Sequence, residues 1–562
     1  MTTKFLKKYY TLFIAILLIS FSLHLNAQNQ NNFKIAKSLD IYSNLIKELN
    51  INYVDEIFPE KLMKAGIDAM LQELDPYTVF IPESEIEEYE MITTGTYGGI
   101  GVLIHQQDGK TIISEIYKGF PAQVSGLQVG DQVIKIDDIS IKDKASTEVS
   151  KMIKGPAKTS TKITVKRFGV DELMDFTFNR EIVKIENVPY YGLLDNNIGY
   201  IKLVGFSHNA TTEVKNALLD LKSKTKLKGL VLDLRGNGGG LMNEAIDIVN
   251  LFVDQNKEVL STKGKIEESN MTYKTRFSPI DKEIPLAVLI DNGSASSSEI
   301  VAGALQDLDR AVIVGQRSYG KGLVQNIIPL SYNTQVKVTI AKYYIPSGRC
   351  IQSIDYSLKN ENDEFAKIPD SLISEYKTQS GRKVYDGGGI DPDIKVAPST
   401  FSQLTANLYG RFLIFDYATK FKSEHPSIAK AKDFKISDEN YQDFLAFLKQ
   451  EKFSYQTQYE RTLEVLKKQA EKENSFEEVK NEFAALETAI KENKSTEYIK
   501  YQEEIKRILK MEIVSRYYYI AGEVETSLDN DLDLDKALEV LMNQNQYQAL
   551  LLPTSNKILG KK

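Results

Sequence analysis

Apolar residues recur every three or four positions near both ends of this 562-residue chain. Such spacing places them on one face of a helix. One set runs from Leu39 to Leu49 and a second from Leu62 to Leu74, so residues 33–92 are predicted to form a helical region. Residues 401–562 show the same spacing and are rich in Lys, Glu and Tyr, which predicts a second helical region.

Two motifs in residues 401–562 indicate helix starts. Ser475–Glu478 has the spacing of a capping box, which predicts a helix beginning there. Asp529–Asp533 alternates aspartates as a calcium loop does, but Leu534 stands where that loop needs glycine and Val540 where it needs glutamate. We therefore interpret these aspartates as acidic residues that lead into a helix.

Short strands separated by glycines replace the helical pattern between residues 93 and 180. A glycine-rich turn, Gly98-Gly99-Ile100-Gly101, enters a strand, and a helix at Thr147–Ile153 precedes a further strand at Lys162–Arg167. This order resembles a PDZ domain. In that family the corresponding loop offers backbone N–H groups to a C-terminal carboxylate, and the bound peptide adds a strand to the sheet edge. The alternative is a glycine-rich turn without a ligand.

Strands and helices alternate between residues 181 and 400. Apolar strands are expected at Ile198–Leu203, Gly229–Leu234 and Leu286–Ile290, with an amphipathic helix between the first two. The second strand opens into a glycine-rich turn, Arg235–Gly240, which is typical of an α/β fold. Because sites in such sheets lie beyond the carboxyl ends of strands, this turn and the serine-rich turn Asp291–Ser298 are expected at one edge.

Composition narrows the class of protein. The chain is 42% hydrophobic and 26% charged, as globular proteins are, and three or four domains fit its length. The net charge of -7 and the lack of a basic cluster give no indication of nucleic-acid binding. Cys350 is the single cysteine, so an intramolecular disulfide is excluded and a cysteine-ligated zinc site is not expected.

The N-terminus has the pattern of a secretory signal. Lys4, Lys7 and Lys8 precede an apolar stretch from Thr11 to Leu25, and a polar run starts near Ala27. The stretch is shorter than the roughly 20 residues that span a bilayer as a helix. Residues 1–27 are therefore predicted to be a signal peptide, with an uncleaved anchor as the alternative, and the protein is expected in the periplasm or cell envelope.

The serine-rich turn is a candidate for nucleophilic chemistry, which requires a base. No Gly-x-Ser-x-Gly elbow occurs in the chain. The four histidines are His24, His105, His208 and His425, and a Ser-His-Asp triad would need one of the last two. Neither has a sharp motif around it, so a base other than histidine is expected.

Lys321 is the alternative base, because burial can lower the pKa of a lysine until its neutral amine accepts a serine proton. It stands between Gly320 and Gly322, which would let the backbone pack closely around it. Gln325 could orient the amine by a hydrogen bond.

Oxyanion donors could come from the Gly238-Gly239-Gly240 turn and from the N–H of Ser297. On chemistry alone Ser294 and Ser298 rival Ser296 as the nucleophile, since all three lie on one turn.

The segment that ends at Lys321 also partly matches a nucleotide-binding motif. Gly315–Lys321 matches the phosphate-binding P-loop as far as its lysine, but Gly322 stands where Ser or Thr must hold Mg²⁺. A P-loop also runs into a helix, whereas this segment leads to Pro329 and a strand-like run at Val336–Ile340. Both departures argue against nucleotide binding.

Together these motifs resemble the carboxyl-terminal processing, or tail-specific, protease family. Asn292–Glu299, Gly320–Gln325 and Asp233–Gly240 carry the resemblance, which continues through Tyr344–Arg349 and Gly387–Asp393. Members carry a PDZ domain before a Ser-Lys catalytic core, and the resemblance spans roughly residues 35 to 400.

The resemblance implies a role for each site residue. Ser296 is the nucleophile, Lys321 the general base and Gln325 its orienting partner. Gly239 and Ser297 match the oxyanion-hole positions, although Gly238 stands where proline is usual.

We therefore expect a multidomain α/β protein with a PDZ-like domain at 93–180 before a Ser-Lys protease core at 181–400. It would be a serine endopeptidase that holds protein C-termini in its PDZ domain and cleaves near them through an acyl-enzyme, without cofactor or metal. The alternative is a non-catalytic PDZ-type scaffold with a relic core. A homodimer through the N-terminal helices and an adaptor on residues 401–562 are the expected partners besides protein substrates.

Overall fold

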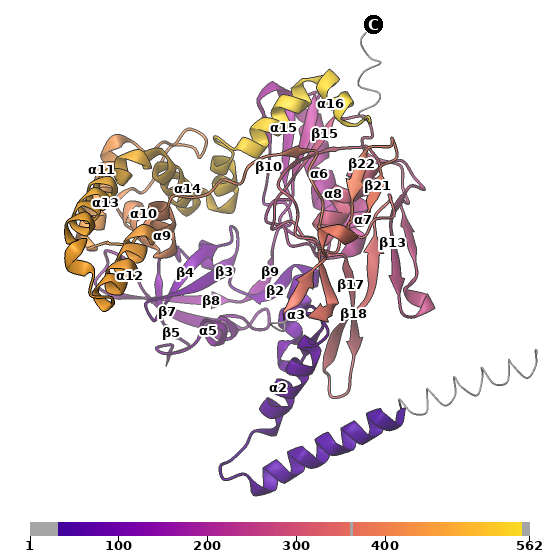
Figure 1. Cartoon of the computed structure of the whole chain (residues 1–562), viewed down its shortest axis with the longest axis horizontal. Helices are drawn as coiled ribbons and strands as arrows, with labels where there is room; N and C mark the ends of the chain where they lie inside the picture. Colours follow the sequence, from indigo (N-terminus) through magenta and orange to yellow (C-terminus); the bar gives the residue numbers. More distant parts are fainter. Residues whose placement is uncertain (1–31, 360–363, 554–562) are drawn as a thin grey trace, which may run out of the picture.

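The computed structural model describes residues 32–359 and 364–553. The predicted signal, residues 1–27, lies outside the described residues. Figure 1 shows an N-terminal helical arm, a PDZ-like sheet domain beside a group of C-terminal helices, and an α/β core to which the last two helices return. Within the described residues no helix is both long and apolar enough to cross a bilayer.

The N-terminal region is helical except for one strand that the sequence pattern did not predict. It contains a helix over residues 32–52, α2 (Pro59–Gln72), β1 (Val79–Ile81) and α3 (Ile86–Thr94). β1 is a strand because it pairs antiparallel with the distant strand β18 (Gln335–Tyr344), and such long-range pairing overrides a local helical pattern. In Figure 1 the first helix projects away from the rest of the protein.

The PDZ-like domain is a sheet with the strand order β3-β4-β5-β7-β8, so β3 lies at one edge. Its apolar core includes Ile113, Val149 and Ile163, which are buried on the sheet and on helix α5. The elements are β3 (Val102–Gln107), β4 (Lys110–Ile116), α4 (Pro121–Val124), β5 (Gln132–Ile136), β6 (Ile139–Ser140), α5 (Ser146–Ile153), β7 (Ser160–Lys166) and β8 (Leu173–Asn179). A separate ribbon of β2 (Thr96–Gly99) and β9 (Glu181–Lys184) leads into and out of it.

The α/β core has a six-stranded sheet with the order β10-β11-β12-β15-β16-β23, parallel from β11 onward. Its strands are β10 (Tyr190–Leu194), β11 (Ile198–Lys202), β12 (Gly229–Asp233), β15 (Leu286–Ile290), β16 (Val312–Gly315) and β23 (Ile394–Lys395). Helices α6 (Ala210–Lys224), α7 (Met242–Asn250) and α8 (Ser297–Asp307) cover one face. Every residue of β12 and β15 is buried, which explains their continuous apolar sequence.

A second sheet lies next to this core. It joins β17 (Leu323–Pro329), β18, β13 (Glu258–Gly264) and β14 (Thr272–Lys274) in that order. β1 also pairs with β18, on the side opposite β17. Two small hairpins follow in the chain. They consist of β19 (Ile354–Lys359) with β20 (Phe365–Lys367), and β21 (Glu375–Lys377) with β22 (Lys383–Tyr385).

The helices after residue 401 lie in two places. In one group, α9, α10, α11 and α14 pack around an aromatic core that includes Tyr417 and Phe444, and α12 and α13 share a smaller apolar cluster with Leu463 and Phe483. Its bounds are α9 (Gln403–Gly410), α10 (Leu413–Glu424), α11 (Asp438–Gln450), α12 (Gln458–Lys472), α13 (Lys480–Lys500) and α14 (Gln502–Ser527). The capping-box prediction at Ser475 is wrong, because only a 3-10 turn forms at Phe476–Glu478 and α13 begins five residues later.

The last two helices, α15 (Leu532–Met542) and α16 (Gln544–Leu550), cover the second face of the core sheet. The aspartates before α15 do lead into a helix, since the Asp531 side chain accepts from the N–H groups of Asp533 and Leu534. Asp531 and Asp533 also pair with Arg235, at 2.7 and 3.0 Å. The C-terminal helices are thereby fixed to the strand end that precedes the glycine-rich turn.

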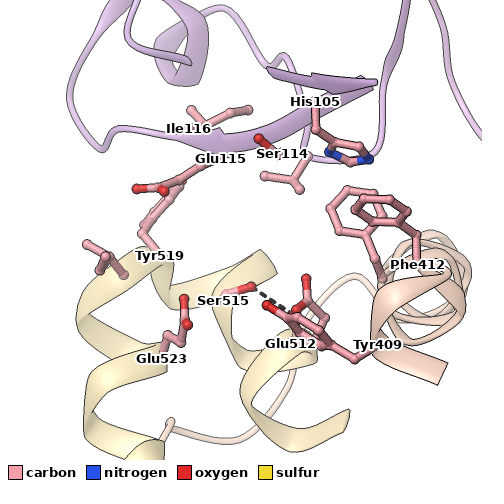
Figure 2. Close-up of a pocket in the computed structure, with 13 residues that line it drawn as sticks. His105, Ser114, Glu115, Ile116, Tyr409, Phe412, Glu512, Ser515, Tyr519 and Glu523 are labelled. Atoms are coloured by element: carbon pink, nitrogen blue, oxygen red, sulfur yellow. Dashed lines mark hydrogen bonds between the residues drawn. The ribbon is translucent and has the colours of Figure 1, made fainter. Parts of the chain in front are cut away.

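A cavity of about 290 Å³ separates the PDZ-like sheet from α14 (Figure 2). The two parts meet beside it, where the His105 ring stacks on Phe412 with centroids 4.3 Å apart. Burial, together with repulsion from Glu512 and Glu115, raises the pKa of Glu523 in this cavity to about 7. The folded protein therefore favours the protonated form of Glu523. The free energy of unfolding consequently falls as pH rises from the ordinary pKa of glutamate through about 7, where this carboxyl ionises in the folded state.

Candidate active site

Two turns meet beyond the carboxyl ends of the neighbouring parallel strands β12 and β15. The N–H of Ala295 donates to the carbonyl of Asn237 at 3.0 Å. The N–H of Gly236 donates to the Asp291 carboxylate at 2.8 Å. The glycine-rich turn and the serine-rich turn therefore form one unit, at the edge of the sheet that the sequence pattern predicts.

The four serines of this unit differ in what their hydroxyls do. Three are buried and hold the two turns together by donating to backbone carbonyls. These are Ser294 to Leu234 at 2.9 Å, Ser297 to Gly240 at 2.9 Å and Ser298 to Asn237 at 2.8 Å. Ser296 is not fully buried, and its hydroxyl donates to no acceptor within the described part of the chain; its oxygen faces the first turn of α8, where Ser296 and Glu299 form a capping box. This difference favours Ser296 over Ser294 and Ser298 as a nucleophile, because the hydroxyls of the other two are already donated to backbone carbonyls.

Ser296 has a backbone conformation that is rare for a residue with a side chain, at φ 55° and ψ -111°. Such strain persists only where the surroundings hold it. Gly239 supplies part of that support, because a Cβ there would lie 2.9 Å from the Cβ of Ser296. The turn consequently presents the Ser296 side chain at the start of α8.

Glu299 joins the serine turn to the lysine loop. One carboxylate oxygen accepts from the Ser318 hydroxyl and from the N–H of Gly320, both at 2.6 Å. The other accepts from the N–H groups of Ser296 at 2.8 Å and of Lys321 at 2.9 Å. Burial raises the pKa of Glu299 above its ordinary value, and these four donors oppose that shift. No motif in the sequence assigned a role to Glu299, although Ser296 and Glu299 have capping-box spacing.

Lys321 lies on the loop between β16 and β17, packed as closely as its flanking glycines predicted. A Cβ on Gly322 would stand 2.8 Å from the backbone nitrogen of Gln352. The Lys321 amine lies 4.2 Å from the centre of the Tyr77 ring. Burial, together with the positive charge of Lys337, lowers the pKa of Lys321 to about 8.

The expected contacts of the lysine amine are not made in this arrangement. Among the described residues no hydrogen bond joins the Lys321 amine to Ser296 or to Gln325. Gln325 instead donates its side-chain N–H to the Thr339 hydroxyl at 3.2 Å. Gln325 and Thr339 are directly paired between β17 and β18, so their side chains lie side by side on one face of the sheet. The structure thus brings the three side chains to one region without closing the network.

The oxyanion-hole candidates are in different states. Ser297 is the first residue of α8, and its N–H has no acceptor among the described residues. Gly239 has a φ of +99°, and its N–H donates to the side-chain oxygen of Asn237 at 2.9 Å. A rotation of the Asn237 side chain would free this second donor.

The predicted carboxylate-binding loop leads into the edge strand β3. Gly98 is packed so tightly that a Cβ would lie 2.1 Å from the carbonyl oxygen of Gly155, and Gly101 has a φ of +82°. The carbonyls of Ile100 and Gly101 accept from Ala122 and Tyr117, both at 2.9 Å. Their N–H groups have no acceptor in the described part of the chain. With Gly99, which pairs with β9, the loop has two unoccupied donors beside an unpaired strand edge.

Neither a metal nor a nucleotide is indicated at this site. Across residues 32–359 and 364–553, no group of three or more His, Cys, Asp or Glu side chains is arranged to hold a metal ion. The segment after Lys321 enters the strand β17 and not a helix, unlike a P-loop.

We expect Glu299→Gln to lower the free energy of unfolding by about 2–4 kcal/mol. An amide NH₂ would face N–H and O–H donors, and each buried donor left unsatisfied costs about 1–3 kcal/mol. Urea unfolding followed by circular dichroism measures this change. Ser318→Ala is the comparison variant: it removes one of the four donors to Glu299 and also the acceptor of the buried Ile390 N–H, so it should cost about 1–2 kcal/mol, less than Glu299→Gln. Equal stability of Glu299→Gln and the wild type would contradict the joining role of the carboxylate.

Comparison with known proteins assigns the family. Residues 197–358 match Peptidase family S41, residues 112–167 a PDZ domain, and residues 404–541 the C-terminal helical domain of a probable PDZ-protease. The chain is 36% identical to the carboxy-terminal-processing protease of Bartonella bacilliformis over 348 residues, covering 61% of this chain and 80% of that protein.

Two further proteins are similar. The carboxy-terminal processing protease CtpA of Bacillus subtilis is 30% identical over 64% of this chain and 75% of its own length. The structure of a photosystem II D1 C-terminal processing protease is 25% identical, with a TM-score of 0.35 over 64% of this chain and 87% of that one. The sequence matches carry the assignment: this chain is a serine peptidase of family S41, in the group of PDZ-containing carboxy-terminal-processing proteases.

Proposed function

We propose that the protein cleaves other proteins near their C-termini with Ser296 as the nucleophile and Lys321 as the general base. The observation that carries this proposal is the contrast among the four serines of the two turns, since the Ser296 hydroxyl is the one that donates to no backbone carbonyl. A partly buried lysine, whose pKa is lowered to about 8, lies in the same site. Neutral lysine can accept a serine proton, which a fully charged lysine cannot.

The reaction would proceed in two steps. Lys321 removes the proton of Ser296 as its oxygen bonds to the scissile carbonyl carbon, and the leaving nitrogen takes that proton as the C–N bond breaks. Water, deprotonated by Lys321, then cleaves the acyl-enzyme ester. The N–H groups of Ser297 and Gly239 would stabilise the negative oxygen in both steps. Gln325, whose side-chain oxygen has no donor among the described residues, would turn from Thr339 and orient the amine.

The PDZ domain would hold the substrate's C-terminal end. The N–H groups of Ile100 and Gly101 are free to donate to a carboxylate, and the edge strand β3 can accept an added strand. Gly98 and Gly99 keep this loop close enough for backbone contact. Names of the similar proteins, which are carboxy-terminal processing proteases, support the same substrate class.

We expect Ser296→Ala or Lys321→Ala to lower kcat/KM by roughly 10³-fold or more, as loss of a nucleophile or its base does. In the wild type, kcat/KM should rise with pH until about 8 and then level off, because Lys321 is a base only when it is neutral. Cleavage of an unstructured protein, measured by mass spectrometry between pH 6 and 10, checks both expectations.

The same substrate with an amidated C-terminus is the matched control. Loss of the carboxylate should weaken cleavage of the amidated protein by tenfold or more while Ser296→Ala removes cleavage of both. Absence of any product from the wild type at every pH would favour the alternative, a PDZ-type binding protein with a relic core. Full activity of Lys321→Ala would exclude the dyad.

We propose that the N-terminal helix over residues 32–52 joins two copies of the chain. Phe33, Leu39 and Leu45 on this helix are 70, 65 and 52% exposed, which is unusual for apolar side chains without a partner. Light scattering should find a dimer that the double variant Leu39→Glu, Leu45→Glu converts to a monomer. A wild-type monomer at micromolar concentration would exclude this contact.

An adaptor is proposed for the apolar groove of α12 and α13, which Leu466 and Leu486 line.

Export to the periplasm or cell envelope is proposed from the first 27 residues alone. N-terminal sequencing of the protein from cells should find a chain that starts near Gln28. A chain that starts at residue 1 and remains with the membrane would instead identify an uncleaved anchor.

A further inference from the structure

The ring of Tyr77 covers the amine of Lys321. The amine lies 4.2 Å from the ring centre, within the range of a cation–π contact. Tyr77 belongs to the N-terminal region and comes just before β1, whereas Lys321 belongs to the loop before β17. The candidate base is therefore enclosed by a segment from outside the core of residues 181–400.

The Tyr77 ring is held on both sides. The buried Asp75 carboxylate accepts from the N–H groups of Tyr77 and Thr78, both at 2.8 Å. This turn continues into β1, whose pairing with β18 fixes its position. The Tyr77 hydroxyl makes hydrogen bonds of 3.4 Å with the hydroxyls of Tyr319 and Tyr356. The ring consequently has little freedom to turn away from the amine.

We propose that Tyr77 is a positioning residue for Lys321, whose ring keeps water from the amine and so keeps the lysine usable as a base. This inference rests on the proposed role of Lys321. No part of the chain's sequence pattern pointed to Tyr77, because it follows a helix-ending Asp75-Pro76 pair and carries no motif of its own.

Two effects of the ring on the lysine oppose each other. Exclusion of water disfavours the charged ammonium, whereas the π face attracts it. Burial is the larger of the causes that act on Lys321. Lys337 on β18 acts in the same direction, while the carboxylates of Asp75 and Glu299 favour the charged form. Removal of the ring should therefore raise the pKa of the amine, because hydration returns at once and the charged neighbours remain.

Three substitutions separate these effects. Tyr77→Phe keeps the ring and loses only the hydroxyl bonds, so it is the matched control. Tyr77→Leu keeps an apolar cover without a π face. Tyr77→Ala opens the amine to water. All three are made in the full chain, both with native Ser296 and in the Ser296→Ala background.

The state of Lys321 is read without catalysis in the Ser296→Ala background. The pH at which an amine-reactive acetyl ester modifies half of Lys321 in a fixed time is measured by mass spectrometry. We expect this pH to rise by about one unit in Tyr77→Ala, to stay unchanged in Tyr77→Phe and to stay or fall in Tyr77→Leu. An unchanged pH in Tyr77→Ala would overturn the proposal.

Activity gives the second reading, with native Ser296. A rise of one pKa unit lowers the neutral fraction of Lys321 about tenfold at pH 7. Tyr77→Ala should therefore lose about tenfold in kcat/KM at pH 7 and recover the wild-type value near pH 10. An equal loss at every pH would mean a purely structural role and would overturn the proposal. If the labelling shifts as expected while wild-type protein cleaves nothing, the proposed function fails and the Tyr77 contact stands.

Discussion

One buried carboxylate connects the parts of this active site. Glu299 accepts four hydrogen bonds, two from the lysine loop backbone, one from the serine-rich turn and one from the Ser318 hydroxyl. A buried carboxylate needs such donors, because without them its desolvation is not compensated. The backbones of Ser296 and Lys321 cannot separate without breaking this cluster. The proposed contact between the Ser296 and Lys321 side chains would therefore form by side-chain movement.

A second group of buried charges fixes the end of strand β12 beneath the site. Burial opposes ionisation of Asp233 at the end of β12, but Lys202 and Arg235 outweigh it and hold the pKa of that carboxyl well below its usual range. Arg235 in turn binds Asp531 at the start of α15. The residue that begins the glycine-rich turn is thus tied to the end of the chain. Because charge pairs of this kind are buried and directional, they set the position of the turn more than they add to stability.

The sequence predicted the parts of the site that depend on local pattern. The apolar run Leu286–Ile290 is a strand with those bounds, and the two turns lie at the edge of the sheet where parallel strands end. It did not predict β1, Glu299 or Tyr77, because each acquires its role from a partner far away in the chain. The capping box predicted at Ser475 does not form, whereas the same spacing at Ser296 and Glu299 forms a box whose carboxylate also accepts from the lysine loop.

The site is therefore assembled from three segments with different attachments. The serine and glycine turns belong to the rigid sheet, the lysine loop is fixed to them by Glu299, and the Tyr77 turn depends on the three residue pairs between β1 and β18. A short edge strand is the weakest of these attachments, because few hydrogen bonds hold it. Movement of the N-terminal arm would thus expose the Lys321 amine to water before it displaced Ser296. The basicity of Lys321 and the exposure of Ser296, the proposed base and nucleophile, can consequently vary independently in this fold.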